Sequence, residues 1–316
     1  MERRPRVVVS KCLGFESCRY NGQIISSDEV KEMRDHMDFI TVCPESEIGL
    51  GVPRDPVRLV RDGQDKKLVQ PNTGRDVTSE MKDYCADFLK ENSDVDGFIL
   101  KSKSPSCGLK ETKIYAAIDG AAPVAKGAGF FGDAVLKYHP KKAIESEGRL
   151  RNYQIRDHFL TKIYALSSFR GVKNLEELQK FHEHNRLLLK SYDEEMYEKL
   201  CTLSGEGGSL KYYEEILYEL FNRPPECESK IKIMNELFTE LKGNVEEDEI
   251  DFFEVSLDEY REGNTSLNVP LSILYTWVLR AKDSGLKYQS FFNPYPRKLV
   301  RLEDVRTCVA RDYWNY

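Results

Sequence analysis

The sequence predicts an α/β N-terminal domain with a parallel sheet, residues 1–150, followed by an all-α C-terminal domain, residues 151–316. Two observations support this prediction. Short β-rich runs alternate with helical stretches in the first half, and helical periodicity replaces them near residue 150. A chain of 316 residues also exceeds the size at which one hydrophobic core usually keeps growing, so two domains are expected.

The first half alternates strand and helix. We expect a strand at 6–10, a helix at 27–37, a strand at 38–42, a helix at 78–91 and a strand at 95–101. Such a β-α-β-α-β order predicts a parallel sheet with helices on its faces.

The segment 51–74 interrupts that order. It is long and contains both prolines and arginines. Because long structureless loops are uncommon inside a compact domain, we expect an ordered functional loop or a small subdomain here.

Apolar residues in the second half recur at helical spacing. Three such stripes lie at 210–220, 234–241 and 271–278. Stripes of this kind are typical of the buried faces of a helix bundle, so we assign them to the core.

Composition places the chain among soluble proteins. It is 40% hydrophobic and 32% charged, which is enough apolar material to form cores. No window approaches eighteen uninterrupted apolar residues, and the basic start at residues 1–6 is not followed by an export signal. The sequence therefore predicts a cytoplasmic protein without a membrane partner.

The net charge of -6 argues against a nucleic-acid partner, but its distribution weakens that argument. Two stretches, 148–173 and 280–311, are locally basic. Exposed charges separated by more than a Debye length hardly interact at physiological salt, so these stretches could bind phosphates. The alternative is two solvated helix faces. The candidate RNA-binding residues are Arg151, Arg156, Lys162, Arg170, Arg297 and Lys298.

Three cysteines follow three short apolar runs: Cys12, Cys43 and Cys107. If those runs are neighbouring parallel strands, the thiols converge at the carboxyl edge of one sheet, where open α/β folds build their sites. In a reducing compartment, cysteines are expected to be metal ligands or buried residues rather than members of disulfides. The spacing predicts a shared metal site, with scattered reduced cysteines as the alternative.

The spacing also bears on the kind of metal. Thiolate zinc sites usually contain Cys-x-x-Cys pairs, and the chain has none. Single cysteines delivered by different strands suit an iron-sulfur cluster, which needs ligands spaced around it. Cys18 is a candidate fourth ligand. Four thiolates would indicate electron transfer, whereas three would leave one iron able to act as a Lewis acid.

Polar side chains accompany two of these cysteines. Glu45 follows Cys43 in Cys43-Pro44-Glu45, and Ser104 precedes Cys107 in Ser104-Pro105-Ser106-Cys107-Gly108. The prolines stiffen both turns, which matters where reacting groups must be held in place. The alternative is that the serines only cap a turn and that Glu45 is solvated.

Four ordered motifs in the first half resemble those of the TudS-type thiouracil desulfidases. They are Lys11-Cys12-Leu13-Gly14 with Arg19-Tyr20-Asn21-Gly22, Val42-Cys43-Pro44-Glu45, Pro53-Arg54-Asp55-Pro56, and Lys101-Ser102-Lys103-Ser104-Pro105-Ser106-Cys107-Gly108. The second half contains Phe181-His182-Glu183-His184-Asn185 and Asn293-Pro294-Tyr295-Pro296. It resembles the helical domain fused to TudS in the RudS-type tRNA 4-thiouridine desulfidases.

The resemblance implies a 4Fe-4S cluster held by Cys12, Cys43 and Cys107, with an open iron that takes sulfur from a thiocarbonyl without net redox change. It implies catalytic roles in proton handling for Glu45 and Ser104. The implied partner is tRNA carrying 4-thiouridine, bound by the helical domain. One alternative substrate is free 2-thiouracil or a related thionated base. Another reading is a non-catalytic zinc or redox-sensing scaffold that uses all four cysteines.

Residues 127–132 satisfy the G-x-G-x-x-G pattern of dinucleotide sites. The preceding strand-like run is nine residues away, and position 152 is Asn where such sites carry an acid. We therefore do not expect a dinucleotide site. A glycine loop that lets the backbone approach the substrate is the better prediction.

Overall fold

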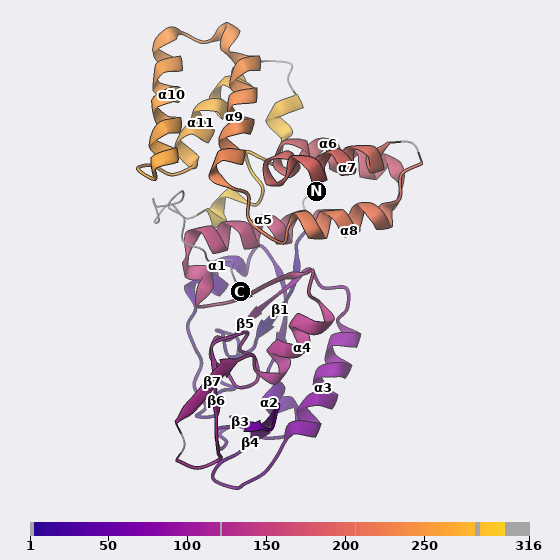
Figure 1. Cartoon of the computed structure of the whole chain (residues 1–316), viewed down its shortest axis with the longest axis vertical. Coiled ribbons are helices and arrows are strands. Elements are labelled where there is room, and N and C mark those ends of the chain that lie inside the picture. Colours follow the sequence, from indigo (N-terminus) through magenta and orange to yellow (C-terminus); the bar gives the residue numbers. More distant parts are fainter. Residues whose placement is uncertain (1–2, 121, 206, 282–284, 301–316) are drawn as a thin grey trace. The chain divides into compact units, whose positions relative to one another are not determined.

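The computed structural model describes residues 3–120, 122–205, 207–281 and 285–300 (Figure 1). The chain divides into two compact units, one of Arg4–Arg151 and one of Asn152–Tyr316 together with the three N-terminal residues. Among the described helices, none has the length and apolar character needed to span a bilayer.

A parallel sheet forms the centre of the first unit. Its four strands lie in the order β2-β1-β5-β8, and every neighbouring pair is parallel. The strands are β1 (Arg6–Ser10), β2 (Asp38–Val42), β5 (Gly97–Leu100) and β8 (Ala143–Ser146). The predicted α/β class and parallel sheet are confirmed, because the strands at 6–10, 38–42 and 97–100 are neighbours in this sheet.

Helices cover this sheet and supply its core. They are α1 (Asp28–Met33), α2 (Pro44–Glu47), α3 (Thr78–Glu91) and α4 (Phe130–Tyr138). Phe98 of β5 shares one buried cluster with Met81 of α3 and Phe131 of α4. The hydroxyl of Ser27 caps α1 by accepting from the N–H of Val30, as the predicted helix start requires.

A second, mixed sheet occupies the predicted subdomain. Its order is β4-β3-β6-β7, with β3 (Arg58–Asp62), β4 (Asp65–Val69), β6 (Thr112–Tyr115) and β7 (Pro123–Gly127). Strands β3 and β4 pair antiparallel, and β3 pairs parallel with β6. The segment 51–74 therefore contributes a hairpin to a small subdomain.

The second unit is helical throughout its described residues. Its α-helices are α5 (Tyr153–Phe169), α6 (Leu175–Tyr192), α7 (Glu194–Ser204), α8 (Leu210–Leu220), α9 (Cys227–Leu241), α10 (Glu247–Glu262) and α11 (Asn268–Arg280). Short 3₁₀ turns are η1 (Arg149–Arg151) at the end of the first unit and, in the second, η2 (Lys242–Asn244), η3 (Gly285–Tyr288) and η4 (Arg297–Leu299). The three apolar stripes lie in buried clusters of these helices, as predicted.

Candidate functional site

The three predicted cysteines lie at the carboxyl edge of the parallel sheet. Cys12 is two residues beyond β1, Cys43 directly follows β2, and Cys107 lies in the loop that follows β5. Strand β1 lies between the other two strands, so the three chain segments leave the sheet side by side. Cys43 and Cys107 are buried, and Cys12 is half-buried.

Cys18 joins this group, although it lies in the loop that precedes α1. Its thiol is hydrogen-bonded to the thiols of both Cys12 and Cys43, and it is buried. Cys107 hydrogen-bonds with the Ser10 hydroxyl and interacts electrostatically with Cys43. Four thiols therefore gather at one edge of the sheet.

Burial and mutual hydrogen bonds raise the pKa of three of these thiols, Cys18, Cys43 and Cys107. The hydrogen bond with Cys12 raises the pKa of Cys18 to about 11, and burial raises the pKa of Cys107. Because a thiol must deprotonate to bind a metal, metal uptake at this edge would release protons.

The donor set bears on what this group could hold. Within the described ranges, no three His, Cys, Asp or Glu side chains are arranged around the position of a single metal ion. An iron-sulfur cluster is larger, and its thiolate ligands are spaced around it. The thiols gathered at this edge therefore fit a cluster better than a single ion.

Glu45 is held from both carboxylate oxygens. It lies in the first turn of α2, and its Oε2 accepts from Arg54 Nε at 2.9 Å and Nη2 at 2.8 Å. Its Oε1 accepts from the Ser106 hydroxyl at 2.9 Å. The side chains of Arg54 and Glu45 are only 3% and 12% exposed. The alternative of a solvated Glu45 is therefore wrong, because the carboxylate is paired inside the fold.

Sequence reasoning assigned no role to Arg54, which connects several parts of the site. Its Nη1 donates to the carbonyls of Cys18 at 3.0 Å and Gly51 at 2.8 Å. Its Nη2 also lies 3.9 Å from the Cys43 sulfur. The motif Pro53-Arg54-Asp55-Pro56 was a signal, since it places a cation in a stiff turn, but only the fold brings it to Glu45.

The two serines before Cys107 make different contacts. The Ser104 hydroxyl oxygen accepts from the N–H groups of Ser106 at 3.2 Å and Cys107 at 3.0 Å, so it caps the turn. Ser106, which sequence reasoning did not select, is the serine that contacts Glu45. The sequence could not separate them, because both flank Pro105.

The glycine-rich segment packs against the turn that carries Cys107. The N–H of Gly129 donates to the Gly108 carbonyl at 2.8 Å, and that of Gly132 donates to the Ser106 carbonyl at 3.1 Å. A Cβ at Gly129 would lie 2.4 Å from the Ser106 carbonyl oxygen, and one at Gly132 would lie 2.2 Å from that of Gly108. The glycines therefore allow the backbone to approach this turn closely, whereas the approach to a substrate stays a prediction.

The start of the same loop is fixed by a buried carboxylate. Glu147, just beyond β8, accepts from the Ser102 N–H at 2.6 Å and the Ser102 hydroxyl at 2.8 Å. It also pairs with the ammonium of Lys101. The start of the loop that carries Cys107 is thus tied to the end of β8, and its later part contacts the segment 129–132.

The predicted RNA-binding residues fall into two groups. Arg156 and Lys162 are only 2% and 8% exposed within α5, and burial lowers the pKa of Lys162 to about 8. The expectation that these two contact phosphates is corrected, because both side chains are buried. Arg170 is half-buried. Three candidates are exposed: Arg151, Arg297 and Lys298. The part of the basic stretch at 301–311 lies outside the described residues.

Comparisons with known proteins find matches in both halves of the chain. Residues 7–147 match the family model of 2-thiouracil desulfurase, and residues 186–296 match a model described as a protein of unknown function, DUF1722. The uncharacterised protein YbbK of Bacillus subtilis (strain 168) is 34% identical over 110 residues, which cover 32% of this chain and 72% of that protein. A solved structure of the [4Fe-4S]-dependent thiouracil desulfidase TudS is 29% identical and covers 47% of this chain and 94% of that chain, with a TM-score of 0.37. The chain therefore belongs to the 2-thiouracil desulfurase family, whose enzymes act on thionated bases, and it carries a DUF1722 region after that domain.

Proposed function

We propose that this protein is a cytoplasmic, 4Fe-4S-dependent desulfidase that converts 4-thiouridine in tRNA to uridine. The observation that carries the proposal is the gathering of Cys12, Cys43 and Cys107 at one sheet edge, beside a paired carboxylate. Family membership supports the reaction class, and the exposed cations of the helical unit support an RNA substrate.

Cys12, Cys43 and Cys107 would hold the cluster, since each comes from a different strand end. When bound, a cluster with one iron free of protein ligands supplies a Lewis acid that prefers a soft thiocarbonyl sulfur. The site would thereby select the thionated base over the ordinary one.

The protein's part in the reaction is proton handling. Water adds its oxygen to the ring carbon, and its two protons pass one to a base and one to sulfur. Sulfur leaves as hydrosulfide with the electrons of the carbon-sulfur bond, so no electron acceptor is needed. Glu45 would accept the proton from water, with Arg54 and Ser106 fixing its two oxygens. General-base catalysis of this kind contributes about 10²- to 10⁴-fold in rate.

Ser104 would act on the base itself. Its oxygen accepts from two backbone N–H groups, which leaves its own hydrogen available to donate. We assign that hydrogen to a ring nitrogen of the thionated base, which gains negative charge as water adds to the neighbouring ring carbon.

The helical unit would bind the RNA. A nucleotide within a folded RNA must be unstacked before its ring can reach the cysteines. Arg297 and Lys298 of this unit, and Arg151 at the end of the first unit, carry exposed charge that suits phosphate contacts, with Arg170 half-buried. The alternative substrate, a free thionated base, needs none of these contacts.

The test is desulfuration by anaerobically reconstituted protein. Loss of 4-thiouridine absorbance from purified tRNA and release of sulfide are measured for the native chain, for Cys107→Ala and for the control Cys201→Ala. We expect native and Cys201→Ala protein to be active and Cys107→Ala to lose both cluster and activity. Activity on free 2-thiouracil but not on tRNA would establish the alternative substrate. A colourless protein containing zinc would overturn the enzymatic proposal.

A second arm tests the RNA contacts. Affinity for tRNA is measured against salt for the native chain and for the charge reversal Arg151→Glu with Lys298→Glu. Each lost phosphate contact should reduce the slope of log affinity against log salt by about 1. An unchanged slope would remove these residues from the proposal.

A further inference from the structure

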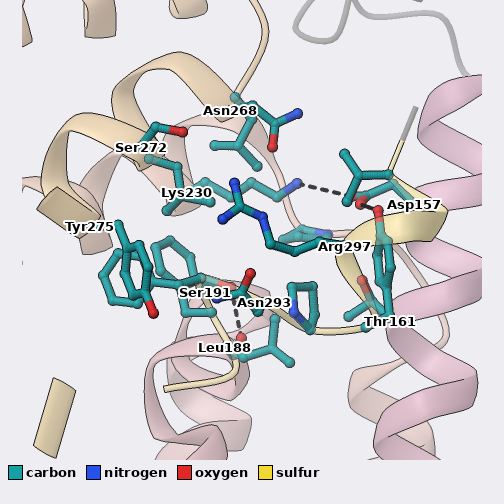
Figure 2. A pocket seen from close by; sticks show the side chains of 18 of the residues that line it. Asp157, Thr161, Leu188, Ser191, Lys230, Asn268, Ser272, Tyr275, Asn293 and Arg297 are labelled. Carbon is teal, nitrogen blue, oxygen red and sulfur yellow. Dashed lines mark hydrogen bonds and ion pairs between the residues drawn. The ribbon is translucent and has the colours of Figure 1, made fainter. Parts of the chain in front are cut away.

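A cavity in the helical unit has no role in the desulfidase proposal. Its volume is about 550 Å³, and it is lined by residues of α5, α6, α9 and α11 and of the segment 291–300 (Figure 2). Cavities of 300–1,000 Å³ are the usual size of small-molecule sites. This one is large enough for a nucleotide.

One wall of the cavity carries a compensated carboxylate. Asp157 Oδ1 accepts from the Tyr295 hydroxyl at 2.6 Å, and its Oδ2 lies 3.8 Å from the ammonium of Lys230 (Figure 2). Both charged side chains are largely buried. The negative charge of Asp157 is therefore balanced within the wall.

Arg297 supplies the remaining charge. Figure 2 shows its side chain extending across the middle of the cavity, between Lys230 and Asn293. Among the described residues, no hydrogen-bond or ion-pair partner of its guanidinium is found. With Asp157 balanced by Lys230, the cavity carries a net positive charge. A guanidinium fork matches the oxygens of a phosphate in two parallel hydrogen bonds.

Aromatic and amide side chains also line the cavity, together with aliphatic and hydroxyl side chains. The aromatic residues are Tyr153, Tyr192, Tyr275, Phe291, Phe292 and Tyr295. The ring of Tyr275 packs on that of Phe292 with centroids 5.0 Å apart. Asn268 and Asn293 add carboxamides, which both donate and accept, as the edge of a nucleobase does.

We infer that this cavity binds a nucleotide, with the phosphate on Arg297, the base against the aromatic wall at Tyr275, and the base edge at Asn293. A bare phosphate would leave the aromatic wall unused, and an apolar ligand would leave the guanidinium without a partner. The nucleotide is either a residue of an RNA chain or a free mononucleotide. Where it belongs to RNA, the inference rests on the proposed function.

Calorimetric titration of the full chain with uridine 5′-monophosphate, uridine and inorganic phosphate tests the inference. We expect the monophosphate to bind more tightly than either fragment. Arg297→Ala should weaken the affinity for the monophosphate at least tenfold and leave the affinity for uridine nearly unchanged. Arg297→Lys keeps the charge but loses the two parallel donors of the guanidinium. Its affinity for the monophosphate should lie between those of the native and Arg297→Ala proteins. Lys211→Ala is the control, since this exposed cation of α8 does not line the cavity.

Circular dichroism establishes that each variant is folded. Absence of monophosphate binding, or equal binding by native and folded Arg297→Ala protein, would overturn the inference. A single-stranded oligoribonucleotide then identifies the source: tighter binding than the monophosphate, lost in Arg297→Ala, assigns the cavity to RNA, and binding of the monophosphate alone assigns it to a free nucleotide. Titration of Cys107→Ala separates the two proposals, because loss of desulfuration with intact nucleotide binding concerns only the cysteine site.

Discussion

Arg54 donates two hydrogen bonds, from Nε and Nη2, to the same carboxylate oxygen of Glu45, at 2.9 and 2.8 Å. The pair lies inside the first unit, and the same guanidinium reaches the carbonyl of Cys18. One cation thus positions the proposed base and the loop that carries a thiol. This couples the proton chemistry of the site to its metal-binding edge.

The buried pair predicts a strong and non-additive effect on stability. Arg54→Met leaves the Glu45 carboxylate buried without its cation, which costs about 3–5 kcal/mol of unfolding free energy. Adding Glu45→Gln should recover part of that loss, because the uncompensated charge is gone. Urea unfolding of both single variants and the double variant measures the coupling. Arg75→Met, which breaks the exposed pair with Glu80, is the control and should cost about 1 kcal/mol or less. Simple additivity of the two buried changes would contradict the pairing.

The serines of the turn predict separable defects. Ser106→Ala removes a hydrogen bond to a charged group, about 1.5–3 kcal/mol, so the turnover rate should fall about tenfold to a hundredfold with iron content unchanged. Ser104→Ala removes the acceptor of two N–H groups in the turn that carries Cys107, so it should lower iron content as well as rate. Ser106→Thr retains the hydroxyl and should restore activity. Iron and sulfide assays beside rate measurements distinguish the two serines, and identical iron loss in both variants would contradict the assignment.

Cys18 predicts the number of cluster ligands. Its thiol contacts Cys12 and Cys43, yet the open-iron mechanism requires only the three strand-end cysteines. We therefore expect Cys18→Ala to retain the iron and sulfide content of the native protein, whereas Cys12→Ala loses it. Mössbauer and EPR spectra show directly whether one iron of the cluster lacks a cysteine ligand. A cluster that survives only with Cys18 present would indicate four thiolate ligands and electron transfer.

The glycine contacts predict that cluster content depends on the close packing of the segment 129–132 against the turn that carries Cys107. A methyl group at Gly129 or Gly132 meets carbonyl oxygens of the turn that carries Cys107, at 2.4 and 2.2 Å, and backbone cannot move aside cheaply. Gly132→Ala should therefore reduce cluster content and activity together. Gly127→Ala is the control, because its nearest neighbour is the Ile114 Cδ1 at 3.0 Å, the end of a flexible side chain. Equal cluster content in the two variants would show that the turn tolerates displacement.

The sequence was informative about the sheet edge because the signal there is local. A short apolar run followed at once by Cys43 is visible in one dimension, and parallel strands bring such positions together. Arg54 and Ser106 could not be selected in this way. Their roles depend on contacts with Glu45 across 9 and 61 residues, which no local pattern encodes.

Charge patterning was informative only in part. Arg156 and Lys162 have the residue types of a phosphate-binding face, but α5 is buried around most of its circumference. A basic residue on such a helix is buried with its neighbours. Arg297 and Lys298 lie beyond the last described α-helix, in a short 3₁₀ turn, and remain exposed.

His158 of α5 predicts how the free energy of unfolding depends on pH. Its Nδ1 lies 3.0 Å from the Tyr192 hydroxyl, and burial lowers its pKa to about 3 in the folded protein. The unfolded chain has the ordinary value of about 6.5, so it binds the proton first as the pH falls. The contribution of this histidine to stability is therefore constant above about pH 6.5 and declines between that value and pH 3, by about 2 kcal/mol at pH 5. Urea unfolding followed from pH 8 to pH 5 measures this slope. His158→Gln, which cannot titrate, should be less stable at pH 8 and lose less on acidification, and a variant with the native slope would show that other groups set the dependence.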